Sequence, residues 1–290
     1  MSFQTIHQIL SQPLLVDSPY RNVSHHTRSV FWITPADTSR WTGFTLENIL
    51  AAYGDILGRT ETNPPRARND FAIRSLPSVK RMVVNYFHGL LPQPLEAGRQ
   101  GLASRLGLGM GPIDMRQFGQ VGAGRPLTMV TSGDEPLVIG AVRMQSDWSS
   151  EDPKGTQLFD QLLGYANQGS TRYGFAVTDA EFVVTQAYRH GDGMAIQYHT
   201  IPIDASGMDE LTPALALWCL AMMALNRHHR APVAEEETCS FNTWYKDIRD
   251  KGQVTYIHYL SGAVRATEPP QEGLKVLDMT EEPKSSSPSA

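Results

Sequence analysis

The stretch LVIGAVRMQSDW, residues 137–148, decides the fold of this chain. It begins with an apolar run, LVIGA, which is typical of a strand that is buried on both faces. The preceding residues read RPLTMV and then TSGDEP, in which Gly133 and Asp134 are residues that favour a turn. The sequence therefore predicts two neighbouring strands joined by a tight turn, with residues 137–145 forming the second strand.

The side chains of this second strand divide into two sets. Residues two apart in a strand point to the same face. Ala141, Arg143 and Gln145 are therefore expected on one face, with Val142 and Met144 on the other.

The segments after residue 148 complete an α/β (α+β) pattern. Residues 149–168 show helical periodicity, and residues 174–178, 182–188 and 195–201 follow as three short strands. An apolar helix is expected next, with Thr212 as its N-cap. We therefore predict a mixed sheet flanked by helices.

The N-terminal region, residues 1–110, is predicted to be a helical extension. FTLENILAAYGDIL (44–57) and SLPSVKRMVVNYFHGLL (75–91) repeat apolar residues every three or four positions, and Thr45 suits an N-cap. Eight glycines lie between Gly98 and Gly124, several of them in LGLGMGP. Because no strand precedes this segment, a phosphate-binding loop is disfavoured and an irregular mobile loop is expected.

The composition limits the class of partner. The net charge is −5 and the pI about 6.0, whereas domains that mainly bind nucleic acid usually carry a basic surface. The longest apolar run, LALWCLAMMAL, has 11 residues and is too short to span a bilayer, which takes about 20. We expect a cytoplasmic protein, with the nucleus as an open alternative, no membrane association and an oligomeric state that the sequence leaves open.

Two longer phrases, QLLGYANQGSTRYGFAVTDAEFVVTQAYR (161–189) and LTPALALWCLAMMA (211–224), carry a family resemblance. Together with the order strand, turn, strand, helix, strand, strand, they resemble the fungal branch of the PD-(D/E)XK, or restriction-endonuclease-like, superfamily. The resemblance covers about residues 120–230. It implies a restriction-endonuclease-like core over residues 111–266, followed by a tail over 267–290 whose Pro-, Glu- and Ser-rich composition predicts disorder.

The resemblance also implies a metal site that this chain lacks. In the family, Pro-Asp begins one strand, an acid and a lysine two residues apart lie on the next, and the carboxylates hold a divalent cation. Here Leu127 stands for the aspartate, Ala141 for the acid and Arg143 for the lysine, while Gln161 and Tyr165 match the family's Gln-x-x-x-Tyr helix. We therefore predict no metal, no cofactor and no nuclease activity.

The residues at this place have structural as well as functional interpretations. Arg143 either binds an anionic group or pairs with Asp147 or Asp134. Gln161 and Tyr165 either line a site or pack under the sheet. Trp148 is more often a core or rim aromatic than a binding platform.

Three classes of function stay open. The first is a cofactor-free enzyme of fungal secondary metabolism, a cyclase or isomerase acting on a small, partly apolar molecule, with an intramolecular Diels–Alder closure as its sharpest form. The others are a nucleic-acid-binding protein that has lost cleavage and a protein-interaction module. The first is favoured, because the metal ligands are missing and the net charge disfavours nucleic acid. Catalytic roles then fall to Arg143, Gln145, Gln161 and Tyr165, and substrate contacts to Ala141, Met144, Trp148 and Leu127.

Overall fold

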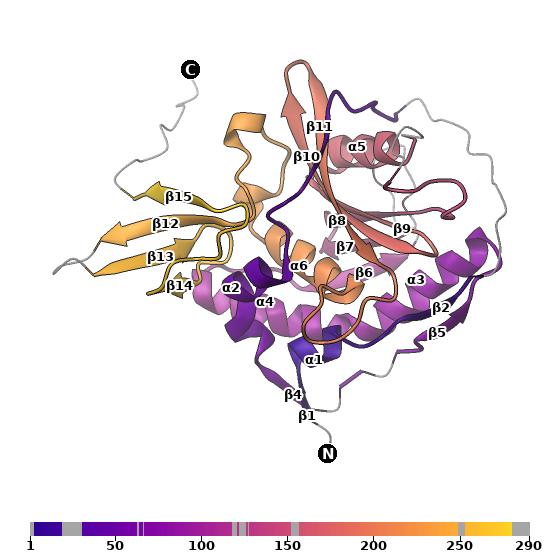
Figure 1. The fold of residues 1–290 in the computed structure, drawn as a ribbon, viewed down its shortest axis with the longest axis horizontal. Helices are drawn as coiled ribbons and strands as arrows, with labels where there is room; N and C mark the ends of the chain where they lie inside the picture. Colours follow the sequence, from indigo (N-terminus) through magenta and orange to yellow (C-terminus); the bar gives the residue numbers. More distant parts are fainter. Residues whose placement is uncertain are drawn as a thin grey trace.

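A large mixed sheet organises the chain (Figure 1). The computed structural model describes residues 3–18, 31–62, 64–65, 67–117, 121, 126, 128–151, 157–248 and 253–279. Within them, seven strands form this sheet in the order β3 (Thr38–Arg40), β11 (Gly193–Pro202), β10 (Glu181–His190), β9 (Tyr173–Val177), β8 (Glu135–Val142), β7 (Thr128–Ser132) and β6 (Ile113–Gln117). The expected α+β class and the mixed sheet are confirmed.

The predicted order of elements is found in the middle of this sheet. β7 and β8 are antiparallel and meet at a turn in which Gly133 has a φ of 58°, a left-handed conformation that glycine adopts without strain. β8 and β9 are parallel. Parallel neighbours need a crossover connection, and the helix α5 (Gln157–Gly169) supplies it.

The strands bury both faces against helices. On β9, Phe175 and Val177 join the main apolar core, whereas Ala176, between them, joins a smaller cluster under α5. Every residue of α6 (Pro213–Leu225) is buried, and all of them after Pro213 belong to the main core. Figure 1 shows α5 beside the β10–β11 hairpin, while α6 lies among the N-terminal helices. None of the helices in the described part of the chain is both long and apolar enough to cross a membrane.

Local sequence signals set the helix starts. Thr212 Oγ1 accepts a hydrogen bond from the Leu215 N–H at 3.2 Å, and Pro213 occupies the first turn of α6. Thr45 Oγ1 accepts in the same way from the Asn48 N–H at 3.3 Å. Both predicted caps are confirmed.

The N-terminal region is helical and also contributes strands. Its helices are α1 (Ile6–Leu10), α2 (Leu46–Leu57), α3 (Leu76–Leu90) and α4 (Pro92–Leu106). Its short strands form two pairs, β1 (Phe3–Thr5) with β4 (Thr60–Thr62) and β2 (Leu15–Asp17) with β5 (Asp70–Ala72). β3, from the same region, extends the large sheet beside β11.

The predicted irregular loop after residue 98 is wrong over much of its length. α4 continues to Leu106, and β6 begins at Ile113. Gly98 lies inside α4 because the helix crosses α6 closely there: a Cβ at this position would stand 2.7 Å from both Trp218 and Met222. The glycine serves helix packing, which sequence periodicity does not reveal.

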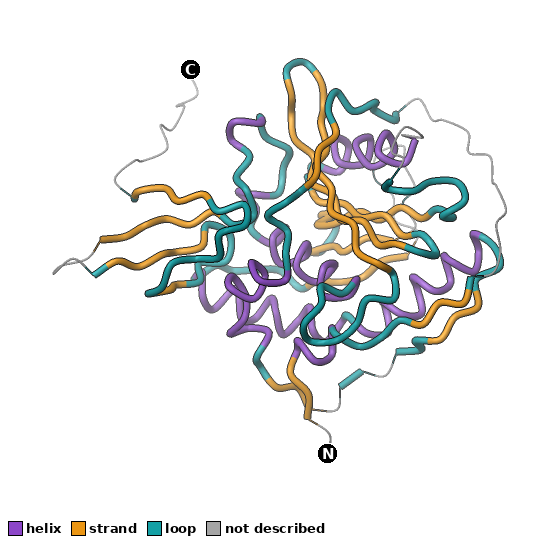
Figure 2. The backbone as a smooth tube through the Cα atoms, viewed as in Figure 1, coloured by secondary structure: helices purple, strands orange, loops and turns teal. Residues whose placement is uncertain are grey.

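A second sheet follows α6. After the short 3₁₀ helices η1 (Arg227–His229) and η2 (Glu235–Glu237), it contains β14 (Val264–Arg265), β13 (Val254–His258), β12 (Thr243–Ile248) and β15 (Lys275–Asp278), in that order. Figure 2 shows its strands apart from those of the large sheet. β15 pairs in parallel with β12, so the prediction of disorder is wrong for residues 267–279, and residues 280–290 lie outside the described part.

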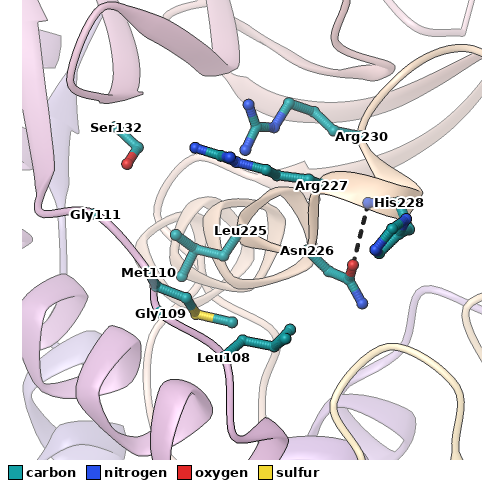
Figure 3. A pocket seen from close by; sticks show the side chains of 10 residues that line it. All are labelled: Leu108, Gly109, Met110, Gly111, Ser132, Leu225, Asn226, Arg227, His228 and Arg230. Carbon is teal, nitrogen blue, oxygen red and sulfur yellow. Dashed lines mark hydrogen bonds between the residues drawn. The ribbon is translucent and has the colours of Figure 1, made fainter.

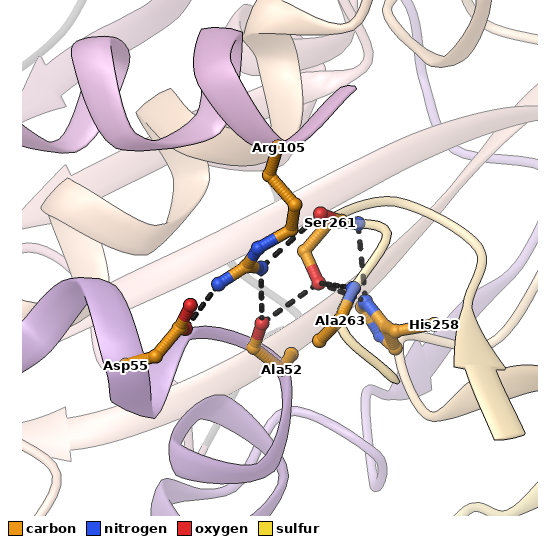
Figure 4. A network of polar contacts seen from close by, with 6 residues as sticks. All are labelled: Ala52, Asp55, Arg105, His258, Ser261 and Ala263. Carbon is orange, nitrogen blue, oxygen red and sulfur yellow. Dashed lines mark hydrogen bonds and ion pairs between the residues drawn. The ribbon is translucent and has the colours of Figure 1, made fainter. Parts of the chain in front are cut away.

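A polar network joins this second sheet to the N-terminal helices (Figure 4). Arg105 of α4 pairs with Asp55 and donates hydrogen bonds to the carbonyl oxygens of Ala52, at 3.0 Å, and Ser261, at 3.1 Å. Ser261 Oγ also donates to Ala52 O at 2.7 Å, and its N–H donates to His258 Nδ1 at 3.2 Å. Three distant segments of the chain therefore share one set of hydrogen bonds, of which those of Ser261 with Ala52 and His258 are buried.

Candidate functional site

The candidate site begins where β8 ends, earlier than predicted. Val142 is the last residue of β8, and the Arg143 N–H adds one further bond to Val177 O at 2.9 Å. The chain then turns, because Met144 O accepts from the N–H groups of Asp147, at 2.9 Å, and Trp148, at 3.2 Å. The alternation expected of a strand therefore stops before Gln145.

Arg143, Gln161 and Tyr165 form a continuous chain of hydrogen bonds, which we call the Arg143 relay. Arg143 Nη2 donates to Gln161 Oε1 at 2.5 Å, and Gln161 Nε2 donates to Tyr165 Oη at 2.7 Å. The second bond joins side chains four residues apart on one face of α5. Arg143 Nη1 also donates to Val142 O at 2.9 Å, which fixes the guanidinium against the end of β8.

The direction of donation in the Arg143 relay follows from the chemistry of its members. A guanidinium only donates, so the amide oxygen of Gln161 must face Arg143 and its NH₂ group must face Tyr165. The Tyr165 oxygen therefore accepts, and its own hydrogen is directed elsewhere. The Gln161 amide thus connects the positive charge of Arg143, at one end of the relay, with the hydroxyl donor of Tyr165 at the other end.

Burial sets the ionisation of both ends. Burial lowers the pKa of Arg143, while the nearby Tyr165 and Asp147 raise it. Burial raises the pKa of Tyr165, against the hydrogen bond from Gln161 and the charge of Arg143, which lower it. The ring of Phe31 stacks on that of Tyr165, with centroids 5.8 Å apart. Tyr165 is consequently a neutral hydroxyl donor at neutral pH.

The described hydrogen bonds of Gln145 lead away from the Arg143 relay. Its N–H donates to Asp179 Oδ1 at 2.7 Å, and its side-chain oxygen accepts from Thr178 Oγ1 at 3.0 Å. Ser18 Oγ donates to the other oxygen of Asp179 at 2.5 Å. The turn between β9 and β10 thus holds Gln145. The sequence marked residues 179–180 as a turn but gave no signal that Thr178 and Asp179 meet Gln145, because the contacts join distant segments.

The residues predicted to contact substrate separate in the structure. Ala141 lies in the apolar cluster under α5, as does Trp148, whose ring meets Phe159 edge-on at 5.3 Å. Met144 belongs to the main core with α6 and Ala141 to the cluster under α5, so the two lie on opposite sides as the alternation predicted, and Met144 does not share a substrate contact with Ala141. Leu127 lies outside the described residues.

The structure also decides between the partners considered for Arg143. Asp134 pairs with Arg116, with the two atoms 3.0 Å apart, and so does not serve Arg143. Asp147 acts on Arg143 through its charge, which raises the pKa of the guanidinium. The hydrogen-bonding partner that the sequence did not foresee is Gln161.

The groups at this end of β8 do not suit a divalent cation. The Ala141 side chain has no oxygen to offer, and Arg143 brings a positive charge to the place where the resembled family has a lysine beside its metal ligands. In the described residues, no group of three or more His, Cys, Asp or Glu side chains is arranged to hold a metal ion.

Neither a family model, nor a curated protein, nor a solved structure matches this chain.

Proposed function

We propose that this chain is a metal-independent enzyme that acts on a small, partly apolar carbonyl compound at the Arg143 relay. The reaction class is a cyclisation or isomerisation without a cofactor, and an intramolecular Diels–Alder closure is one such reaction. The proposal places this chemistry in the cytoplasm, with a small molecule and no nucleic acid as partner. The observation that carries it is the direction of donation from Arg143 through Gln161 to Tyr165.

Polarisation along the Arg143 relay supports the proposal. When the Gln161 oxygen accepts from a cation, its NH₂ group becomes a better donor, and the Tyr165 oxygen that accepts from it gains a more acidic hydrogen. A buried donor of this kind stabilises negative charge that develops on a carbonyl oxygen. In a cyclisation or isomerisation of an unsaturated carbonyl compound, such polarisation speeds the reaction without any change of redox state.

Rigidity supports the proposal as well. Arg143 is held by Val142 O and Gln161, and Tyr165 by Gln161 and the ring of Phe31. A donor that is fixed before the substrate arrives needs little reorganisation during the reaction. The apolar residues that cluster with Tyr165, namely Val121, Met129, Ile139 and Phe31, suit the hydrocarbon part of a substrate.

Gene deletion and complementation test the proposal. A cyclisation or isomerisation does not change molecular mass, so deletion in the source organism should cause an isomer of the final metabolite to accumulate. Mass spectrometry with chromatography would show equal mass and a different retention time. The wild-type gene should restore the product, and Tyr165→Phe, which removes only the donor hydroxyl, should not.

Tyr86→Phe is the matched control. Tyr86 is as buried as Tyr165, and its hydroxyl donates to Gln12 O at 2.9 Å, away from the Arg143 relay. This variant should lose a comparable hydrogen bond and still restore the product. Full restoration of the product by Tyr165→Phe would contradict the proposal. An unchanged metabolite profile after deletion would also contradict it, and would favour a protein-interaction module.

A further inference from the structure

A cavity of about 220 Å³ lies near the far end of β8 from the Arg143 relay. It opens between the glycine-containing segment 108–111 and the C-terminus of α6, and its walls are Leu108, Gly109, Met110, Gly111, Ser132, Leu225, Asn226, Arg227, His228 and Arg230 (Figure 3). Glu135, which begins β8, pairs with the two arginines of this wall. With a rise of roughly 3.3 Å per residue, the seven steps of β8 place the two sites on the order of 20 Å apart.

Positive charge exceeds negative charge at this cavity. Arg230 Nη1 lies 2.7 Å and Arg227 Nη2 3.7 Å from the same oxygen of Glu135, so two guanidinium groups share one carboxylate. None of the described residues that line the cavity is acidic. Figure 3 shows both guanidinium groups extending over Leu225 towards Ser132. The arrangement leaves cationic donors at the wall for a second anion.

Arg227 and Arg230 have different structural roles. Arg230 is largely buried, and its Nε donates to Ala224 O at 2.9 Å, which satisfies a carbonyl at the end of α6. The Arg227 side chain is 78% exposed, and among the described residues its one ion pair is the long contact with Glu135. Arg227 is therefore the cation that a ligand can recruit without disturbing the helix.

The rest of the wall is apolar with a few polar groups. Leu108, Met110 and Leu225 supply hydrocarbon surface. A Cβ on Gly111 would stand 2.7 Å from Ser132 Oγ, so a glycine at this position leaves room for that hydroxyl. Within the part of the chain that the structure describes, Ser132 Oγ makes no hydrogen bond, and it can serve a polar substituent of a ligand.

We propose that this cavity binds a small organic carboxylate with an apolar body, the carboxylate against Arg227 and Arg230 and the body against Leu108, Met110 and Leu225. A planar guanidinium matches a carboxylate with two parallel hydrogen bonds. A cavity of about 150 Å³ accommodates benzene, so about 220 Å³ has room for a benzoate that carries a small substituent.

Calorimetric titration of the full chain with benzoate at low ionic strength tests the proposal. Benzoate should bind to the wild-type chain at one saturable site, and Arg227→Ala should weaken its binding about tenfold or more, because a charge-assisted contact is lost. Arg74→Ala is the matched control. Arg74 is also exposed and also has one long ion pair, 3.6 Å to Asp17, so this variant should keep the wild-type affinity.

A second variant moves the affinity in the opposite direction. Glu135→Gln removes the carboxylate that both arginines share, so benzoate should bind more tightly than it does to the wild-type chain. Benzyl alcohol, which lacks the charge, and acetate, which lacks the ring, should both bind more weakly than benzoate. Equal affinity for acetate and benzoate, unchanged affinity in Arg227→Ala, or no saturable binding to the wild-type chain would overturn the proposal.

Discussion

Arg143 is the residue on which the proposed chemistry and a purely structural role make different forecasts. Arg143→Ala removes the charge from the Arg143 relay and leaves Gln161 Oε1 without its donor. Arg143 acts through Gln161 and leaves the Tyr165 hydroxyl in place, so product formation should fall by less than the roughly two orders of magnitude (about 2.7–4 kcal/mol) that loss of the preorganised donor itself costs. The unpaired, partly buried amide oxygen should also lower the free energy of unfolding by about 1–3 kcal/mol.

Product assays beside thermal melting separate these effects for Arg143→Ala. The variant should still melt cooperatively, because the apolar cluster under α5 is untouched. Arg143→Lys is the conservative comparison. It keeps the charge and one donor, so its activity should lie between that of the wild-type chain and that of Arg143→Ala. A lowered melting temperature with unchanged product formation would remove Arg143 from the site.

At the scale of elements, Gly54 of α2 and Gly98 of α4 form a matched pair for substitution. Replacing a glycine inside a helix with alanine usually gains about 0.5–1 kcal/mol, since alanine restricts the unfolded chain. Gly54→Ala should show this gain, because nothing lies within 4 Å of the added Cβ. Gly98→Ala should instead destabilise the protein, because its Cβ would stand 2.7 Å from Trp218 and Met222 of α6. Urea unfolding of both variants measures the difference, and an equal gain in both would mean that α4 and α6 do not pack as closely as described.

These glycines also show where sequence stops predicting structure. The caps Thr45 and Thr212 act within three residues of themselves, and sequence alone located them. The reason for Gly98 is Trp218, far along the chain, so the local pattern favoured a loop. The Arg143 relay was predictable in part, because Gln161 and Tyr165 are four apart on a helix that follows the strand. Gln145 was misplaced because a turn at Met144 ended the alternation, and its partners Thr178 and Asp179 lie on another strand connection.

The stability of the junction between the second sheet and the N-terminal helices should depend on pH. His258 is buried, with Nε2 2.8 Å from Phe241 O, and burial lowers its pKa to about 4. Between this value and the usual pKa near 6.5, the unfolded chain binds a proton that the folded chain does not. The contribution of neutral His258 to the free energy of unfolding is therefore complete above pH 6.5. It is lost as the pH falls towards 4, by about 3 kcal/mol in total.

Urea unfolding between pH 7 and pH 4.5 measures this effect of His258. His258→Gln cannot take up the proton and keeps an amide that can donate to Phe241 O, so its stability should change less with pH than that of the wild-type chain. Some dependence should persist, because burial also lowers the pKa of His229 to about 4. Equal slopes for the two proteins would show that His258 does not stay neutral in the folded state.

At the scale of the whole molecule, charge and core packing together oppose metal-dependent nuclease chemistry at the end of β8. The net charge of −5 disfavours a polyanionic substrate. Ala141 is 3% exposed in the cluster under α5, so a glutamate there would meet apolar side chains, where an unpaired carboxylate is strongly disfavoured. The variant that combines Leu127→Asp, Ala141→Glu and Arg143→Lys should therefore lose stability and still fail to cut plasmid DNA with Mg²⁺ or Mn²⁺.

The wild-type chain should bind neither ion more tightly than about millimolar by calorimetry, since the position of the resembled family's acid has no carboxylate. Val264→Glu, on an exposed position of β14, controls for the added charge and should unfold like the wild-type chain. Robust metal-dependent cleavage by the triple variant would mean that the chain has a DNA-binding groove, and would place this protein among nucleic-acid binders instead of small-molecule enzymes.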